Sequence, residues 1–232
     1  MHKQLRMIRE HLENPPAKGT LDERMTEVLE RVASCPECVE GGWHPLGFMH
    51  VKFDALGESG LRLHIWPALP PQIESLGWGI HTHNWSLQSY LLCGSLVESL
   101  YEVKRGAKTP LFRIYFANNV GLSNTLQATA EVANVWKKCV RRMSYGTSYA
   151  LPPSVFHSVE IPRNTLTATI LLKKDERATI PEKVIGPLDA LEHHHLARRS
   201  CSKEEVAQAV LMVIKKMIEN RTSSYDIDYS QR

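Results

Sequence analysis

Two histidines separated by a single residue are the feature that most constrains this chain. Residues 81–83, His-Thr-His, lie inside the segment 77–94, GWGIHTHNWSLQSYLLCG. Side chains alternate between two faces of an extended segment, so both imidazoles are expected on one face. His157 lies far downstream, in GTSYALPPSVFHSVE. Three neutral imidazoles that converge from two strands can hold one divalent transition metal and leave coordination positions open. The pattern therefore predicts a metal centre formed by His81, His83 and His157.

The chain around these histidines has the pattern of short β-strands. Apolar residues alternate with polar ones or form short runs, and turn residues separate the runs. The predicted strands are 49–56, 61–66, 79–83, 87–93, 96–103, 111–117, 125–129, 135–144, 149–151, 156–160 and 165–173. So many short strands at this spacing indicate an antiparallel sandwich or barrel, not a βαβ sheet.

Helical patterns flank this β region. Residues 1–48 are expected to form a helical extension, 49–174 the β domain, and 175–232 a connector, a helix and a loose polar tail. Capping boxes, TLDE from residue 20 and SKEE from residue 202, precede apolar residues at helical spacing. Gly41-Gly42 is interpreted as a loosening of the chain, and the run His193 to His195 as surface on a helical connector.

Composition excludes several classes of function. The formal net charge is only +3 and the basic residues are scattered, which argues against nucleic-acid binding. No apolar run approaches the roughly 20 residues that a membrane helix needs. The amino terminus lacks the apolar region of a secretory signal. We therefore expect a cytoplasmic protein.

The five cysteines are odd in number and irregular in spacing, so reduced thiols are expected. Cys35-Pro-Glu-Cys38 is a single CxxC. It is interpreted as a turn after a helix, ended by Pro36. The alternative, a metal or redox half-site, would have only His44 and His50 nearby.

Over residues 49–174 the sequence resembles the cupin superfamily, whose members are small antiparallel β-barrels or jelly rolls. Its first motif is matched by His81, His83 and a closing glycine, Gly94; Leu87 or Gln88 stands where that motif has glutamate. Its second motif is matched in spacing from Gly146 through Pro152 to His157. Ser154 replaces a motif glycine, and Ile161 stands at the asparagine position.

Within cupins the local sequence is similar to the thiol dioxygenases, the cysteine dioxygenase group. That resemblance implies Fe(II) held by three histidines, with a small chelating substrate and dioxygen as partners. The arginine that binds the substrate carboxylate in that group has no counterpart; His50 falls near its position, with Lys52 and Arg62 as other candidates. The Ser-His-Tyr relay of the group is absent from residues 165–173.

Further residues are candidates for the site. His64 is a candidate acid/base or supporting group, and Gln88 a candidate fourth ligand. His50 and Arg62 are candidate anion binders, and Tyr90 and Tyr149 candidate cavity-lining residues. For His64, Tyr90 and Tyr149 a structural role is the alternative.

The prediction is thus a cupin-type β-barrel enzyme, a mononuclear iron oxygenase acting on a small amino acid or thiol-like molecule. Three histidines also suit zinc, nickel and copper. Two alternatives stay open: a metal-dependent isomerase, epimerase or lyase without redox chemistry, and a cupin that binds a small molecule without converting it. The apolar face of the helix at 206–217 would suit a homodimer.

Overall fold

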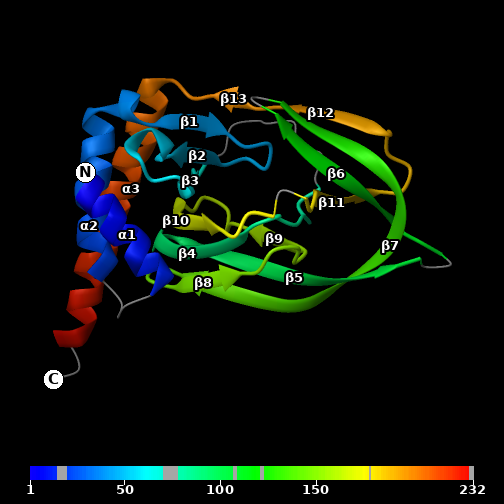
Figure 1. Cartoon of the computed structure of the whole chain (residues 1–232). Helices are drawn as coiled ribbons and strands as arrows, with labels where there is room; N and C mark the ends of the chain where they lie inside the picture. Colours follow the sequence, from blue (N-terminus) through cyan, green and yellow to red (C-terminus); the bar gives the residue numbers. More distant parts are fainter. Residues whose placement is uncertain (15–19, 70–77, 107–108, 121–122, 178, 230–232) are drawn as a thin grey trace.

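The computed structural model describes residues 1–14, 20–69, 78–106, 109–120, 123–177 and 179–229. It is mainly β, with two antiparallel sheets and three helices (Figure 1). The first sheet has the order β13 (Arg199–Ser200), β1 (Glu40–Trp43), β2 (Met49–Lys52), β3 (Leu61–Trp66), β10 (Thr167–Lys174), β4 (Ser86–Cys93) and β8 (Ser148–Leu151). The second has the order β11 (Glu182–Pro187), β6 (Phe112–Val120), β7 (Ser123–Ser144), β5 (Ser95–Arg105) and β9 (His157–Glu160), with β12 (His193–Ala197) paired to β7.

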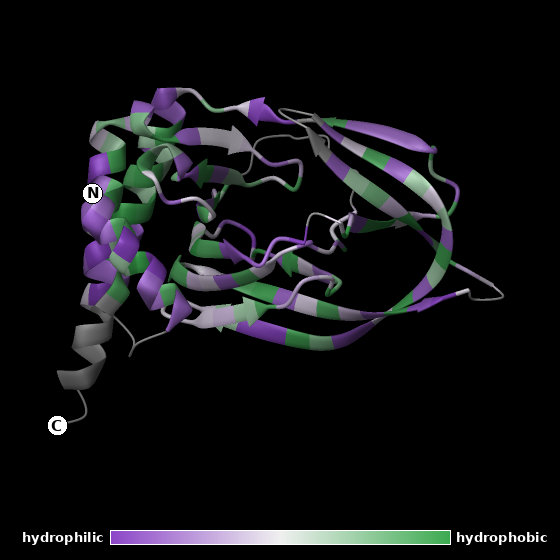
Figure 2. Cartoon of the chain, in the orientation of Figure 1, coloured by the Kyte–Doolittle hydropathy of each residue, from purple (hydrophilic) through white to green (hydrophobic). Residues whose placement is uncertain are grey.

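The helices cover the outer face of the first sheet. They are α1 (His2–Glu13), α2 (Thr20–Ser34) and α3 (Lys203–Tyr229). In Figure 2 their hydrophobic residues gather along the side that meets the sheet. Along β3, Leu61, Leu63 and Ile65 join the core formed with the helices. Because side chains alternate along a strand, Arg62, His64 and Trp66 point the other way, toward the second sheet.

The two sheets are not closed into a barrel, so the predicted jelly-roll barrel is not confirmed. The sheets pack on each other as a sandwich, and Leu171 of β10 lies in one cluster with Leu100 of β5. This cluster places the interior of the β region on the side of the first sheet that faces away from the helices.

Several strand predictions were wrong. Residues 125–129 and 135–144 belong to one strand, β7, which pairs with β6, β5 and β12. Residues 79–83 form only an isolated bridge at His81. The prediction that strands end at residue 174 was also wrong, because β11, β12 and β13 follow it. The polar run His193 to His195 therefore lies on a strand and not on a helical connector, since its backbone completes hydrogen bonds with β7.

The glycine pair Gly41-Gly42 does not loosen the chain, because it lies within β1. A Cβ on Gly41 would come within 2.4 Å of Val206 Cγ2 on α3, and one on Gly42 within 3.0 Å of the His50 ring. The two glycines thus permit close packing on both faces of the strand. The stretch expected to be a loose tail is helical in α3 as far as Tyr229.

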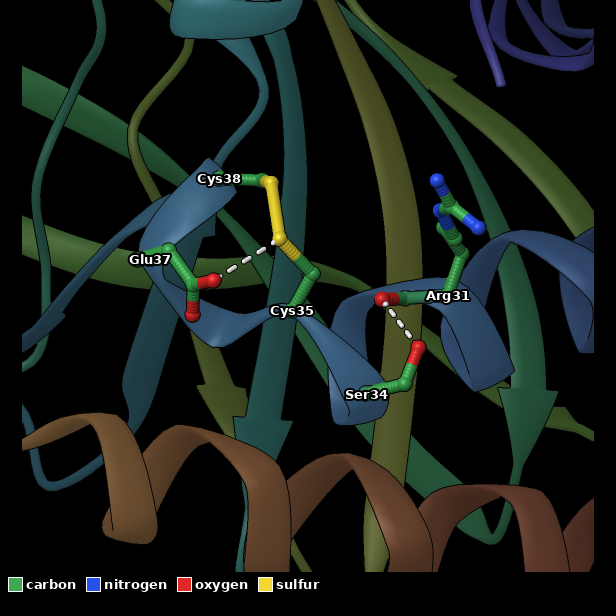
Figure 3. Close-up of a disulfide and its surroundings, with 5 residues drawn as sticks. All are labelled: Arg31, Ser34, Cys35, Glu37 and Cys38. Carbon is green, nitrogen blue, oxygen red and sulfur yellow. Dashed lines mark hydrogen bonds between the residues drawn. A yellow bond between two sulfur atoms is a disulfide. The ribbon is translucent and has the colours of Figure 1, made fainter.

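The prediction that all five cysteines are reduced thiols was wrong for two of them. Cys35 and Cys38 form a disulfide across the 3₁₀ turn η1 (Pro36–Cys38), which begins with proline (Figure 3). Cys93, Cys139 and Cys201 are free. Within the described part of the chain, no helix is both long and apolar enough to cross a membrane.

Candidate metal centre

The segment 80–82 joins the two edge strands of the second sheet. His81 forms an antiparallel bridge with His157 of β9 on one side and with Val184 of β11 on the other. The backbone N–H of His81 donates to the carbonyl of His157, and that of His157 donates to the carbonyl of His81, both at 3.0 Å. This exchange fixes the register that brings the two histidines opposite each other.

The three predicted metal ligands meet at one place. The ring centroids of His81 and His157 are 4.4 Å apart, those of His81 and His83 4.8 Å, and those of His83 and His157 5.1 Å. One nitrogen from each ring lies within 4.8 Å of the other two. His157 is buried, whereas His81 and His83 are half-buried, so the group is enclosed but retains access. The central prediction from the sequence, that these rings converge, is confirmed.

Each imidazole has its Nδ1 next to an oxygen atom. Nδ1 of His81 lies 2.9 Å from the carbonyl oxygen of Gly79, and Nδ1 of His157 lies 3.2 Å from that of Val155. Nδ1 of His83 lies 3.5 Å from a carboxylate oxygen of Glu182. An oxygen at Nδ1 favours the tautomer with hydrogen on that nitrogen, which leaves Nε2 as the electron-pair donor for a metal.

Burial keeps these imidazoles in the neutral form that binds metals. Desolvation is the largest cause that lowers the pKa of His81, and it lowers the pKa of His83 and of His157 well below the usual value. The neighbouring histidines lower the pKa of His83 and of His157 further, because two positive charges at this separation repel. Neutral rings need release no proton before they coordinate a cation.

Trp85 and Glu182 hold His83 in place. The ring of His83 stacks on that of Trp85, with centroids 4.0 Å apart and planes inclined by 20°. The indole N–H of Trp85 donates to the same carboxylate oxygen of Glu182, at 3.0 Å, that lies near His83. Lys173 places its ammonium group 4.9 Å from the centroid of the Trp85 ring. A carboxylate behind a ligating histidine orients its ring and strengthens it as a donor.

His64 and His50 lie on neighbouring strands, opposite each other in the register of β3 and β2. His64 contacts the rings of Phe48 and Trp66, at centroid distances of 4.6 and 5.8 Å. Burial lowers the pKa of His64 well below its usual value, and the charges of His50 and His83 add to this effect. His64 thus faces the interior of the β region, and its role as an acid/base or supporting group stays a prediction.

Gln88 and Tyr90 are not brought to the histidines. They lie opposite Leu172 and Ile170 of β10, on the face that carries the core beneath the helices. The hydroxyl of Tyr90 donates to Asp22 of α2 at 3.0 Å. Their predicted roles as ligand and cavity lining do not agree with this register.

Tyr149 and Arg62 differ in what they contact. Tyr149 packs on the cluster that contains Trp85, the stacking partner of His83, and burial raises its pKa to about 12. Arg62 is paired with Asp54 at 2.9 Å, so its charge is already compensated.

Two residues near the centre were not found from the sequence. Glu182 lies on β11, and Arg198 lies just before β13, both in the segment that was expected to be a connector. The charge of Arg198 lowers the pKa of His44 and of His50. Neither residue belongs to a motif, so only the pairing of β11 with β6 could have indicated Glu182.

No protein-family model matches the chain, and no curated protein gives a match. An antiparallel β-sandwich with a cluster of three histidines is compatible with the cupin superfamily. The fold and the site together define a mainly β protein with a three-histidine group able to hold a metal ion.

Proposed function

We propose that this chain is a mononuclear non-haem iron oxygenase that acts on a small chelating organic molecule. The observation that carries the proposal is the convergence of His81, His83 and His157, with one nitrogen of each within 4.8 Å of the others. Three neutral nitrogen donors and no carboxylate among them leave the charge of a divalent cation uncompensated. Such a site favours a substrate that brings its own negative group.

The donor set fits a transition metal better than magnesium or calcium, which prefer oxygen ligands. His81, His83 and His157 would hold Fe(II), which supplies the one-electron chemistry that dioxygen requires. The chain's own part is to fix the three rings and to limit water. Glu182 and Trp85 orient His83, while backbone carbonyls at residues 79 and 155 orient the other two rings.

The interior next to the centre supports a small substrate with a polar group. His64 points to this interior and, being neutral, can accept or donate one hydrogen bond. Phe48 and Trp66 stand beside it and offer apolar surface for the rest of the molecule. An amino acid or a small thiol meets this description.

The experiment uses protein purified without a tag. We expect the wild type to contain close to one iron per chain and to consume oxygen with candidate thiols or amino acids, and His157→Ala to lose both. His195→Ala is the matched control, because His195 is exposed on β12 and lies outside the cluster. Unchanged iron content and unchanged oxygen uptake in His157→Ala would refute the proposal.

The same three imidazoles also suit zinc, which acts without redox change. A metal-dependent isomerase, epimerase or lyase is therefore the second candidate. Turnover under anaerobic conditions separates the two, since only the oxygenase consumes dioxygen.

A further inference from the structure

A second site is indicated at the edge of the first sheet, apart from the three histidines. A pocket of about 320 Å³ lies among β1, β2, the turn η1, the residues before α3 and the first turn of α3. None of His81, His83 and His157 lines it. The proposed metal chemistry therefore does not account for it.

Side chains that carry N–H groups gather in this pocket. His50 and Lys52 come from β2, Arg198 precedes β13, and Lys203 begins α3. Lys52 is compensated by Glu40, at 3.4 Å. Within the described parts of the chain, no carboxylate lies within ion-pair distance of Arg198 or Lys203, and the charge of Glu182 acts on Arg198 only at longer range.

Two polar atoms of the lining are buried without a hydrogen-bond partner among the described residues. They are Nδ1 of His50 and Nε of Arg198. A buried polar group without a partner costs roughly 1–3 kcal/mol, so such groups are expected to have a partner in the working protein. Nε of Arg198 can donate a hydrogen bond, and so can Nδ1 of His50 in the tautomer that carries hydrogen on that nitrogen, so each lacks an acceptor.

Two acidic side chains and the start of a helix also line this pocket. Glu40 pairs with Lys52, whereas Glu37 has a carboxylate oxygen 3.1 Å from Sγ of the disulfide-bonded Cys35, which has no hydrogen to donate (Figure 3). The start of α3 is closed by its own capping box, in which Ser202 and Glu205 bond to each other's backbone N–H groups. The attraction for an anion thus comes from side chains and not from the helix terminus.

We propose that this pocket binds a small oxyanion, carrying a carboxylate or phosphate group, through Arg198 and His50. A planar guanidinium matches the oxygens of such a group, and a ring N–H from His50 adds a second donor from another strand. Lys203, which is exposed, adds attraction at longer range. None of the three histidines of the metal centre lines this site.

Titration calorimetry of chelator-treated protein tests this site, with inorganic phosphate and acetate as separate probes. We expect wild type and His157→Ala to bind at least one probe equally well. Arg198→Gln should bind it at least about tenfold more weakly, the size expected for loss of a charged hydrogen bond, and His50→Gln more weakly than wild type. Arg142→Gln is the matched control. Arg142 is exposed on β7, so this substitution removes one positive charge outside the pocket.

Each outcome decides the proposal. A preference for phosphate or for acetate identifies which oxyanion the site takes. No binding by wild type, or equal weakening in Arg198→Gln and Arg142→Gln, would overturn it. Loss of binding in His157→Ala with Arg198→Gln unaffected would place the anion at the histidine cluster and also overturn it. Because the protein is metal-free in every arm, a failed oxygenase proposal leaves this test unchanged.

Discussion

His81 and His157 are 76 residues apart in sequence, yet each donates its backbone N–H to the carbonyl oxygen of the other at 3.0 Å. The bridge does not depend on either side chain, so the backbone brings the two imidazoles to a centroid distance of 4.4 Å. A substitution of either ring is therefore expected to remove a metal ligand without opening the bridge. This separation of ligand from scaffold makes variants of the centre informative.

Substitution of Glu182, which lies outside the histidine cluster, should weaken metal binding. Its carboxylate lies 3.5 Å from Nδ1 of His83 and accepts the indole N–H of Trp85 at 3.0 Å. Removal of a carboxylate behind a ligating histidine typically lowers metal affinity by about 10- to 100-fold. We expect Glu182→Gln to show a loss of this size in a competition titration with a chromophoric chelator.

Glu192→Gln is the control for this titration, because Glu192 is exposed and its change removes the same charge. Equal affinities for Glu182→Gln and wild type would contradict the orienting role of Glu182. Equal losses of metal affinity in both variants would mean that the change in net charge, and not the position of Glu182, causes the weakening.

The three ligands could be predicted from the sequence because two histidines at positions i and i+2 of an extended segment lie on the same face. The sequence was not sufficient for the supporting residues. Glu182 stands in a short polar stretch, EKVIGP, whose pairing with β6 no local pattern indicates. Gln88 was misplaced for a different reason: its role was taken from the spacing of the cupin motif, whereas alternation from His83 puts Trp85 and Leu87 in the interior and residue 88 on the opposite face.

The strands after residue 174 were missed because two of them are too short or too polar for a hydrophobic pattern. β13 has two residues, and β12 contains three consecutive histidines. Likewise β7 was divided at residues 130–134, AEVAN, where residues of low β propensity interrupt the apolar pattern. In each case pairing with a neighbouring strand outweighs local propensity.

Gly41 is predicted to be intolerant of any side chain. A Cβ at this position would lie 2.4 Å from Val206 Cγ2 and 3.2 Å from Cys201 Cβ. Since overpacking of a close contact costs typically 1–3 kcal/mol, Gly41→Ala should lower the free energy of urea unfolding by about that amount. Adding Val206→Ala should restore part of the loss relative to Val206→Ala alone. If Gly41→Ala is as stable as wild type, β1 and α3 are not in close contact.

The Cys35–Cys38 disulfide is expected to make a modest contribution to stability. It closes a very short loop at the end of α2, and the loop-entropy relation gives about 2 kcal/mol for such a loop. Cys35→Ser/Cys38→Ser should therefore lower Tm by roughly 4 to 8 °C in a chain of this size. A reducing agent should lower the Tm of wild type similarly and leave the double variant unchanged. Cys139→Ser, at an exposed free cysteine, should match wild type; a wild type that is insensitive to reduction would contradict the prediction.

Acidification should destabilise the metal-free protein through buried neutral histidines. Burial, with Arg198 as the second cause, lowers the pKa of His50 to about 4, against about 6.5 in an unfolded chain. Between these values the unfolded chain binds a proton that the folded chain does not, so the free energy of unfolding falls as the pH falls from 6.5 toward 4.

Urea unfolding of chelator-treated protein at pH 7 and at pH 5 measures this fall. His50→Gln cannot take up the proton, so its stability should decrease less between the two pH values than that of wild type. Some decrease should persist in the variant, because burial also lowers the pKa of His44 and of His64. An equal decrease in both proteins would mean that His50 titrates in the folded chain as it does in the unfolded one, and that its ring is not held in the buried environment beside Arg198.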